Sequence, residues 1–186
     1  SSYQPQRWTG NSAALRCLAM ARLVLGTSNA AKVPMLRAFA EGLEFEVVVG
    51  ANEDTQPSGE EQAATHLAIA VRKAIDWSVL HPDAVILASD GGIAIPSLGN
   101  AWESRLTRRH TGSAQASAEA RARRLIGMMK GLEDSERIAF RVEAVAVMNQ
   151  GTLAGAWEAA GAPCRISHTI APSPAQGPKR WLDFVL

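Results

Sequence analysis

Three polar residues at a fixed spacing follow the first apolar run of the sequence: Thr27, Asn29 and Lys32. The run Leu23–Leu25 is typical of a buried strand, and the segment from Ala30 onwards is typical of a helix. A strand, a polar turn and a helix N-terminus together make an anion site, because free N–H groups and the positive end of the helix dipole face the turn. We therefore predict that Thr27 and Asn29 cap the helix and face a ligand, while Lys32 supplies a point charge for phosphate. A capped helix without a ligand is the alternative.

A lone carboxylate follows a later buried run, Val85–Ala88. The sequence continues as Ser89-Asp90-Gly91-Gly92, which we interpret as a strand end followed by a turn, the glycines allowing tight or positive-φ backbone. Ligands of open α/β sheets bind at the carboxyl ends of strands, so Asp90 is expected close to the polar turn. A phosphate-binding turn beside a carboxylate favours phosphoryl chemistry with Mg²⁺, in which the carboxylate holds the metal or orients water. An Asp-Gly turn without chemistry is the alternative.

A basic cluster lies in the loop that follows: Arg105, Arg108, Arg109 and His110. An arginine fork at this place can clamp a phosphate, and a solvated basic loop is the alternative. The spacing Gly-x4-Gly-Lys-Ser/Thr of a P-loop is absent from the sequence, so the phosphate site is of another kind.

The elements that must position these residues alternate along the first part of the chain. Their apolar patterns predict strands at 23–25, 45–49 and 85–88 and helices at 30–41, 64–80 and 114–130. Two further strands, 137–148 and 152–160, are predicted to pair around the turn Asn149-Gln150-Gly151. The sequence therefore predicts an α/β fold with a βαβ-like first half and antiparallel strands added later.

Bulk properties limit the classes of function. A length of 186 residues suits one domain, which we place at 21–186, and residues 1–20 are polar and aperiodic at first and are expected to be a leader or an added extension. A net charge of +1 provides no strong field for a nucleic acid or an anionic membrane. Cys17 and Cys164 lie far apart and fit a reducing cytoplasm, the four histidines are scattered, and no apolar run reaches the length of a membrane span.

The order of these motifs resembles that of the inosine triphosphate pyrophosphatase family. The family's Thr-x-Asn-x-x-Lys corresponds to Thr27, Asn29 and Lys32, and its Asp-Asp-Ser-Gly-Leu is similar to Ser89–Ile93. Its Ser-Ala-Arg-Tyr-x-Gly has a counterpart in Thr107–Gly112, and the resemblance covers residues 22 to 170.

This resemblance implies hydrolysis of deaminated purine nucleoside triphosphates to a monophosphate and pyrophosphate, with Mg²⁺ as cofactor. It implies an elongated mixed sheet flanked by helices, with two lobes around a central cleft, in a homodimer. Asp90 would be the catalytic base and, with Glu61, a metal ligand. The residues implied in substrate binding are Thr27, Ser28, Asn29, Lys32, Gly91, Arg109 and, by stacking on the base, Trp181.

The chain departs from the family's pattern at two kinds of position. Ser89 replaces the first Asp of the family's acidic pair, and the helix that carries the family's Glu-Asn-Ala has Ala68-Ile69-Ala70 instead. Glu60 and Glu61 are the nearest acidic substitutes, and the segment that reads the purine is reduced to residues 177–183. Two other functions therefore stay open: a non-catalytic nucleotide-binding relative, and a hydrolase of another phosphorylated small molecule.

Overall fold

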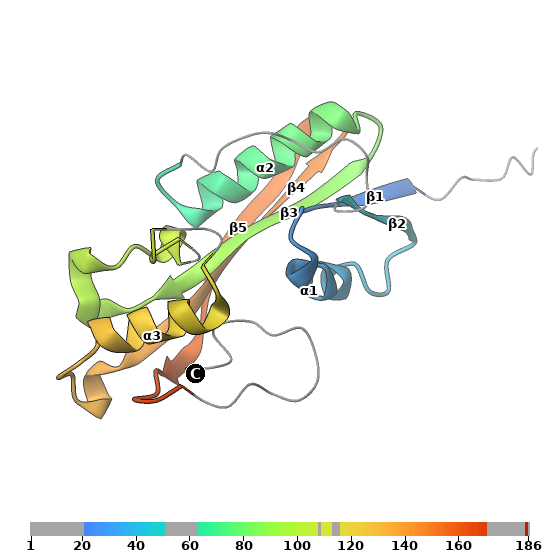
Figure 1. The fold of residues 1–186 in the computed structure, drawn as a ribbon. Coiled ribbons are helices and arrows are strands. Elements are labelled where there is room, and N and C mark those ends of the chain that lie inside the picture. The colour runs from blue at the N-terminus through green and yellow to red at the C-terminus, as the bar shows by residue number, and fades with distance from the viewer. Residues whose placement is uncertain (1–20, 51–62, 108, 113–115, 171–184, 186) are drawn as a thin grey trace, which may run out of the picture.

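The computed structural model describes residues 21–50, 63–107, 109–112, 116–170 and 185, and these form one mixed sheet with helices on both faces (Figure 1). The strand order is β2-β1-β3-β4-β5. The strands are β1 (Ala21–Gly26), β2 (Phe45–Val49), β3 (Val85–Ala94), β4 (Ile138–Asn149) and β5 (Thr152–Arg165). The α-helices are α1 (Val33–Phe39), α2 (His66–Leu80) and α3 (Ala118–Met128), and the short 3₁₀ turns are η2 (Ala30–Lys32), η4 (Pro96–Ala101), η5 (Ser104–Leu106) and η6 (Asp134–Glu136).

The sheet combines a parallel half with an antiparallel half. β1 pairs in parallel with β2 on one side and with β3 on the other, whereas β3, β4 and β5 pair antiparallel. The chain therefore runs from β1 through α1 to β2, and then crosses back through α2 to β3 on the far side of β1. Strand order therefore reverses at β1, with β2 on one side and β3 on the other, and open α/β sheets form ligand sites at such a reversal.

Alternation along the strands assigns the helices to the two faces of the sheet. One set of strand residues packs against α2: Val24, Ile86 and Ala88. Their neighbours along the strands face α1: Leu23, Leu25 and Leu87. Further along β3, Ile93 points to the α1 side and packs against α3. Figure 1 accordingly shows α2 on one side of the sheet and α1 and α3 on the other. Among the described residues, no helix is long and apolar enough to cross a membrane.

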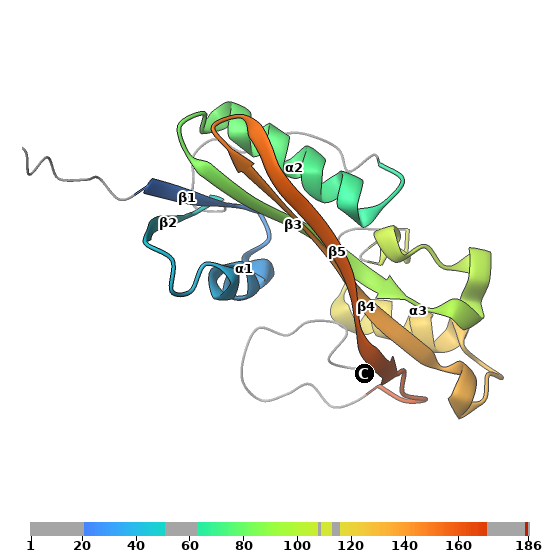
Figure 2. The ribbon, with the colours of Figure 1, turned by 180° about the vertical axis from the view of Figure 1, so that it is seen from behind.

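The predicted hairpin is present and longer than expected. Gln150 and Gly151, at the turn between β4 and β5, have φ of 47° and 76°, the pair of positive values that a tight two-residue hairpin turn requires. β5 extends to Arg165 and forms the outer edge of the sheet, as the view from behind shows (Figure 2).

The interpretation of Ser89-Asp90-Gly91-Gly92 as a strand end and turn is wrong. β3 continues through these residues to Ala94, paired with β4, and neither glycine has a positive φ. The glycines are needed for close approach instead: a Cβ at Gly91 would lie 2.1 Å from Glu143 Oε2, and one at Gly92 would lie 2.1 Å from the carbonyl oxygen of Ser104. Asp90 therefore lies inside the strand β3 rather than in a loop.

A buried arginine joins the end of the sheet to α3. Arg137 precedes β4 and is 1% exposed. Its Nε donates to Ile166 O at 2.9 Å, and its two terminal nitrogens donate to Met129 O at 2.7 Å and Ser167 O at 2.6 Å. Three carbonyl groups from two separate segments, Met129 after α3 and Ile166–Ser167 after β5, thus depend on one guanidinium group, whose fork a lysine does not reproduce.

Replacement of Arg137 by lysine is expected to lower the free energy of unfolding by about 3 kcal/mol, because buried carbonyl oxygens lose their donors. Arg141→Lys, at an exposed position of the same strand β4, is the matched control and is expected to change it by no more than about 0.5 kcal/mol. Urea unfolding followed by circular dichroism measures both values, and equal stabilities of the two variants would contradict the assignment.

Candidate active site

The candidate site lies where β1 ends beside the continuing β3. Gly26, the last residue of β1, pairs with Ala88. β3 extends beyond this pair, so Ser89 and Asp90 follow directly at the carboxyl end of β1, at the reversal of strand order. The polar turn and Asp90 are therefore close together, as expected, but Asp90 belongs to a strand and not to a turn.

Hydrogen bonds within the chain fix the polar turn after β1. Thr27 N donates to Leu25 O at 2.8 Å, and Thr27 Oγ1 accepts a hydrogen bond from Asn29 N at 3.0 Å. Asn29 Oδ1 accepts from Ala31 N at 3.1 Å and caps η2, as predicted. The helix predicted at 30–41 is present but begins with the 3₁₀ turn η2, which continues directly into the seven-residue α1 and ends at Phe39. The groups that the turn offers to a ligand are therefore its side chains, including that of Lys32, rather than the N-terminus of a long α-helix.

Lys32 extends from this turn to the sheet. Its Nζ donates to Ser89 Oγ at 3.2 Å and to Glu143 Oε1 at 2.9 Å. The lysine and glutamate side chains are each about one-fifth exposed, at 21% and 23%. A partly exposed ammonium group at this position is able to contact an anionic ligand, with Glu143 as its partner in the free protein.

Asp90 lies on the opposite face of β3, toward α2, and is buried. Its Oδ1 accepts a hydrogen bond from Lys73 Nζ at 2.8 Å, and its Oδ2 accepts one from His66 Nδ1 at 2.6 Å. Burial alone raises the pKa of this carboxyl, but the hydrogen bond from His66 and the charges of Lys73 and Lys32 outweigh it, so the pKa of Asp90 lies below its ordinary value. The carboxylate is therefore ionised at neutral pH and holds two donors in place.

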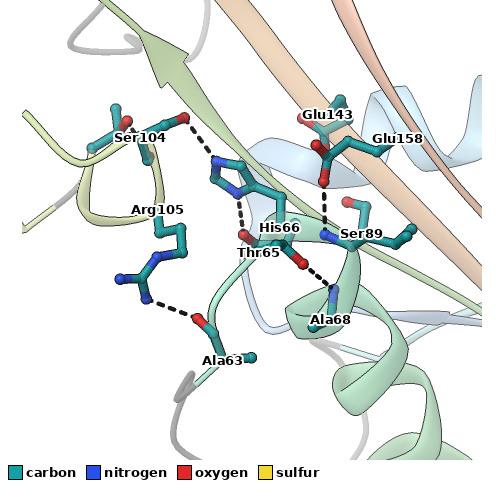
Figure 3. A network of polar contacts seen from close by, with 12 residues as sticks. Ala63, Thr65, His66, Ala68, Ser89, Ser104, Arg105, Glu143 and Glu158 are labelled. Carbon is teal, nitrogen blue, oxygen red and sulfur yellow. Dashed lines mark hydrogen bonds and ion pairs between the residues drawn. The ribbon is translucent and has the colours of Figure 1, made fainter. Parts of the chain in front are cut away.

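The hydrogen bonds continue from His66 to a serine (Figure 3). His66 Nε2 lies 2.8 Å from Ser104 Oγ, in the turn η5. Sequence reasoning did not find His66, Lys73, Ser104 or Glu143. The available signal was the spacing on α2: His66 and Lys73 are seven residues apart, so they lie on one face of the helix and can meet the same carboxylate.

The structure places three residues of the predicted basic cluster, Arg105, Arg109 and His110, in and after η5. Arg105, in η5, reaches the start of α2 through a hydrogen bond from Nη1 to Ala63 O at 2.8 Å (Figure 3). Arg109 is exposed in the turn that follows, and the ring of His110 lies between Thr107 O and Arg121 O, at 2.8 and 3.0 Å. Ser28 is exposed on the polar turn. Arg108, Glu61 and Trp181 lie outside the described residues, so their expected roles stay predictions.

The described residues do not fit a protein-held Mg²⁺ centre. Both oxygens of Asp90 already accept from cationic or imidazole donors, and Glu143 is paired with Lys32. The part of the chain that the structure describes contains no group of three His, Cys, Asp or Glu side chains placed to hold a metal ion. The side of α2 that could approach Asp90 carries Ile69 and Ala70, which offer no oxygen ligand.

Comparison with known proteins decides the family. A family model described as the Ham1 family matches residues 23–162. The chain belongs to the Ham1 family. This is the nucleotide pyrophosphatase family that the order of the sequence motifs indicated, so the resemblance is confirmed. A search of the curated proteins found no match.

Solved structures confirm the Ham1 fold. A HAM1 protein from Coxiella burnetii has a TM-score of 0.69 at 20% identity, with 84% of this chain and 78% of that chain covered. The Ham1 protein from Staphylococcus aureus has a TM-score of 0.64 at 16% identity, with 84% and 77% covered. A nucleoside-triphosphatase, or dITP/XTP pyrophosphatase, from Mycobacterium abscessus has a TM-score of 0.62 at 23% identity, with 82% and 75% covered. The mixed sheet with flanking helices is therefore the Ham1 architecture.

Asp90→Asn is expected to lower the free energy of unfolding at pH 7 by about 2 kcal/mol, since Lys73 and His66 lose their charged acceptor. The folded-state pKa of Asp90 is depressed, so its charge stabilises the fold above the ordinary carboxyl pKa, and this contribution disappears as the pH falls through the folded-state pKa. The stability difference between wild type and variant should accordingly shrink from pH 6 to pH 3 in urea titrations. Asp83→Asn, at an exposed position, is the control, and a pH-independent difference for Asp90→Asn would contradict the ion-pair network.

Proposed function

We propose that this Ham1-family protein hydrolyses nucleoside triphosphates, including deaminated purine nucleotides, to the monophosphate and pyrophosphate. The observation that supports the proposal is the placement of Lys32 and Lys73 beside a buried, ionised Asp90 at the strand-order reversal of this fold. Two ammonium groups that reach β3 from its opposite faces suit a substrate with several phosphates. The dITP/XTP pyrophosphatase similar in fold supports the same reaction class.

Lys32 and Lys73 have different partners in the free protein, and we therefore propose different roles for them in binding the substrate. Lys32 is held by Ser89 and Glu143, and its partial exposure lets an incoming phosphate share or replace these contacts. Lys73 is held by the buried Asp90, so it stays in place when the substrate arrives. We propose that the polar turn contacts the same phosphates, through Thr27, Ser28 and Asn29.

The remaining implied substrate contacts come from three separate places. Gly91 lies in β3, Arg109 follows η5 and Trp181 lies outside the described residues. Their roles in binding, with Trp181 stacking on the base, stay predictions. Asp90 as the base that activates water also stays a prediction, and its two hydrogen bonds favour a role in positioning Lys73 and His66.

Mg²⁺ has a place in this proposal as part of the substrate. Because the described side chains do not form a metal centre, we propose that Mg²⁺ arrives with the triphosphate as a nucleotide complex. Glu61 as a metal ligand remains a prediction. The homodimer and the cytoplasmic location that the family resemblance implies are likewise predictions.

The proposal is tested by measuring pyrophosphate release from ITP, dITP, XTP, ATP and GTP, with Mg²⁺ and with EDTA. We expect release from at least one deaminated nucleotide, at a rate that follows the concentration of the Mg²⁺–nucleotide complex. Binding of a triphosphate by calorimetry without any release would instead support the non-catalytic nucleotide-binding function, which the absence of a metal set among the described residues favours. Neither binding nor release with any nucleotide would contradict both functions.

Lys32→Met is expected to lower kcat/KM for the preferred nucleotide roughly a hundredfold, because a charge-assisted contact to phosphate is lost. Lys130→Met is the matched control, at an exposed position just after α3, and it should leave kcat/KM within about twofold of wild type. An equal effect of the two substitutions would show that Lys32 acts only through net charge.

A further inference from the structure

A serine, a histidine and an aspartate form a continuous line of hydrogen bonds in the described part of the site, and Figure 3 labels the serine and the histidine. Ser104 Oγ lies 2.8 Å from His66 Nε2, and His66 Nδ1 lies 2.6 Å from Asp90 Oδ2. The residues come from η5, α2 and β3, three elements separated in the sequence. This order, a hydroxyl, an imidazole and a buried carboxylate, is the arrangement that activates a serine nucleophile on unrelated folds.

The aspartate fixes which nitrogen of His66 carries a proton. Asp90 is ionised and can only accept, so the 2.6 Å contact requires that Nδ1 donates. In the neutral ring this leaves the lone pair of Nε2 directed at Ser104 Oγ, which then donates its hydroxyl proton to Nε2. His66 is therefore placed as the proton acceptor for Ser104, and Asp90 as the group that orients it.

The backbone around Ser104 is held against β3. Ser104 O accepts hydrogen bonds from Thr107 Oγ1 at 2.6 Å and Thr107 N at 3.1 Å, and Ile93 N donates to the same Thr107 Oγ1 at 3.0 Å. Gly92 allows this approach, because a Cβ there would lie 2.1 Å from Ser104 O and 3.1 Å from His66 Cε1. Ser104 itself is half-buried, whereas His66 and Asp90 are buried. The hydroxyl group is thus fixed in position and still reachable by a ligand.

We propose that Ser104 is a nucleophile that attacks an electrophilic phosphorus centre, with His66 accepting its proton and Asp90 orienting His66. Phosphorus is favoured as the electrophile because Lys73, which bonds to the same carboxylate as His66, brings positive charge to this face of β3. The identification of this phosphorus as the α-phosphorus of a nucleotide rests on the proposed function.

The covalent reaction then has two balanced steps. In the first, the Ser104 hydroxyl proton moves to His66 Nε2, a bond forms between Oγ and the α-phosphorus, and the bond from that phosphorus to the bridging oxygen breaks. Pyrophosphate leaves with the bonding pair and takes the proton from His66. In the second, water gives a proton to His66 and attacks the phosphorus, the bond to Oγ breaks, and Oγ recovers the proton as the monophosphate leaves.

The first test is labelling of the full chain with a fluorophosphonate, which transfers a phosphorus group to an activated serine with loss of fluoride. We expect one adduct per chain, located on Ser104 by peptide mass spectrometry and absent from Ser104→Ala. His66→Gln is expected to slow labelling roughly a hundredfold, because Oγ loses its proton acceptor. A wild-type protein that gains no adduct, or gains it on another residue, would overturn the proposal, as would equal labelling rates in His66→Gln.

Two matched controls separate activation from general effects of substitution. Ser97→Ala removes an exposed serine from the neighbouring turn η4. His168→Gln removes a second histidine–aspartate pair of the described residues, His168 Nε2 with Asp134 Oδ1 at 2.7 Å, which is exposed. Both variants should be labelled at the wild-type rate, and slower labelling in both would overturn the assignment of reactivity to the site.

The second test uses the nucleotide that wild type turns over. Ser104→Ala should lower kcat for pyrophosphate release roughly a thousandfold, with little change in nucleotide affinity measured by calorimetry. Release within threefold of wild type would overturn the role of Ser104 in that reaction. If wild type releases no pyrophosphate from any nucleotide, the proposed function fails, while the labelling result still decides whether Ser104 is a nucleophile.

Discussion

The ionised carboxylate of Asp90 is the interaction on which the arrangement of the site depends. It is buried in the central strand and accepts hydrogen bonds from two residues of α2 that lie two helical turns apart. Because a buried charge is costly without such partners, α2 is held at a fixed rotation and a fixed height above β3. The position of Ser104 follows in turn from that of His66.

The parallel half of the sheet determines where this charge can meet a ligand. β1 ends at Gly26 while β3 continues, so the carboxyl end of β1 provides space for a polar turn beside Ser89. Lys32 reaches the sheet from this turn on one face, and Lys73 reaches it from α2 on the other. The reversal of strand order thus explains why two lysines far apart in sequence reach neighbouring residues of one strand.

The sequence was sufficient to predict the fold class, the hairpin turn, and the proximity of Lys32 and Asp90. Each of these depends on local patterns, either apolar periodicity or polar residues next to a strand. The length of β3 was not predictable in the same way, because Gly91 and Gly92 are typical of turns and here serve close approach to Glu143 and Ser104, which only the packed structure reveals. The partnership of His66 with Asp90 was missed for the same reason: it joins a helix and a strand with no shared motif.

The pairing of β3 has a consequence for how the protein acquires its site. The β4–β5 hairpin joins neighbouring residues such as Asn149 and Thr152, whereas β3 joins only distant partners, with Val85 opposite Leu23 on one side and Asn149 on the other. The entropic cost of closing a loop grows with its length, so the strand that carries Asp90 has the least local support of any in the antiparallel half. We therefore expect the contacts of Asp90 with α2 to form only when β3 has joined both of its neighbours, later than the local β4–β5 hairpin.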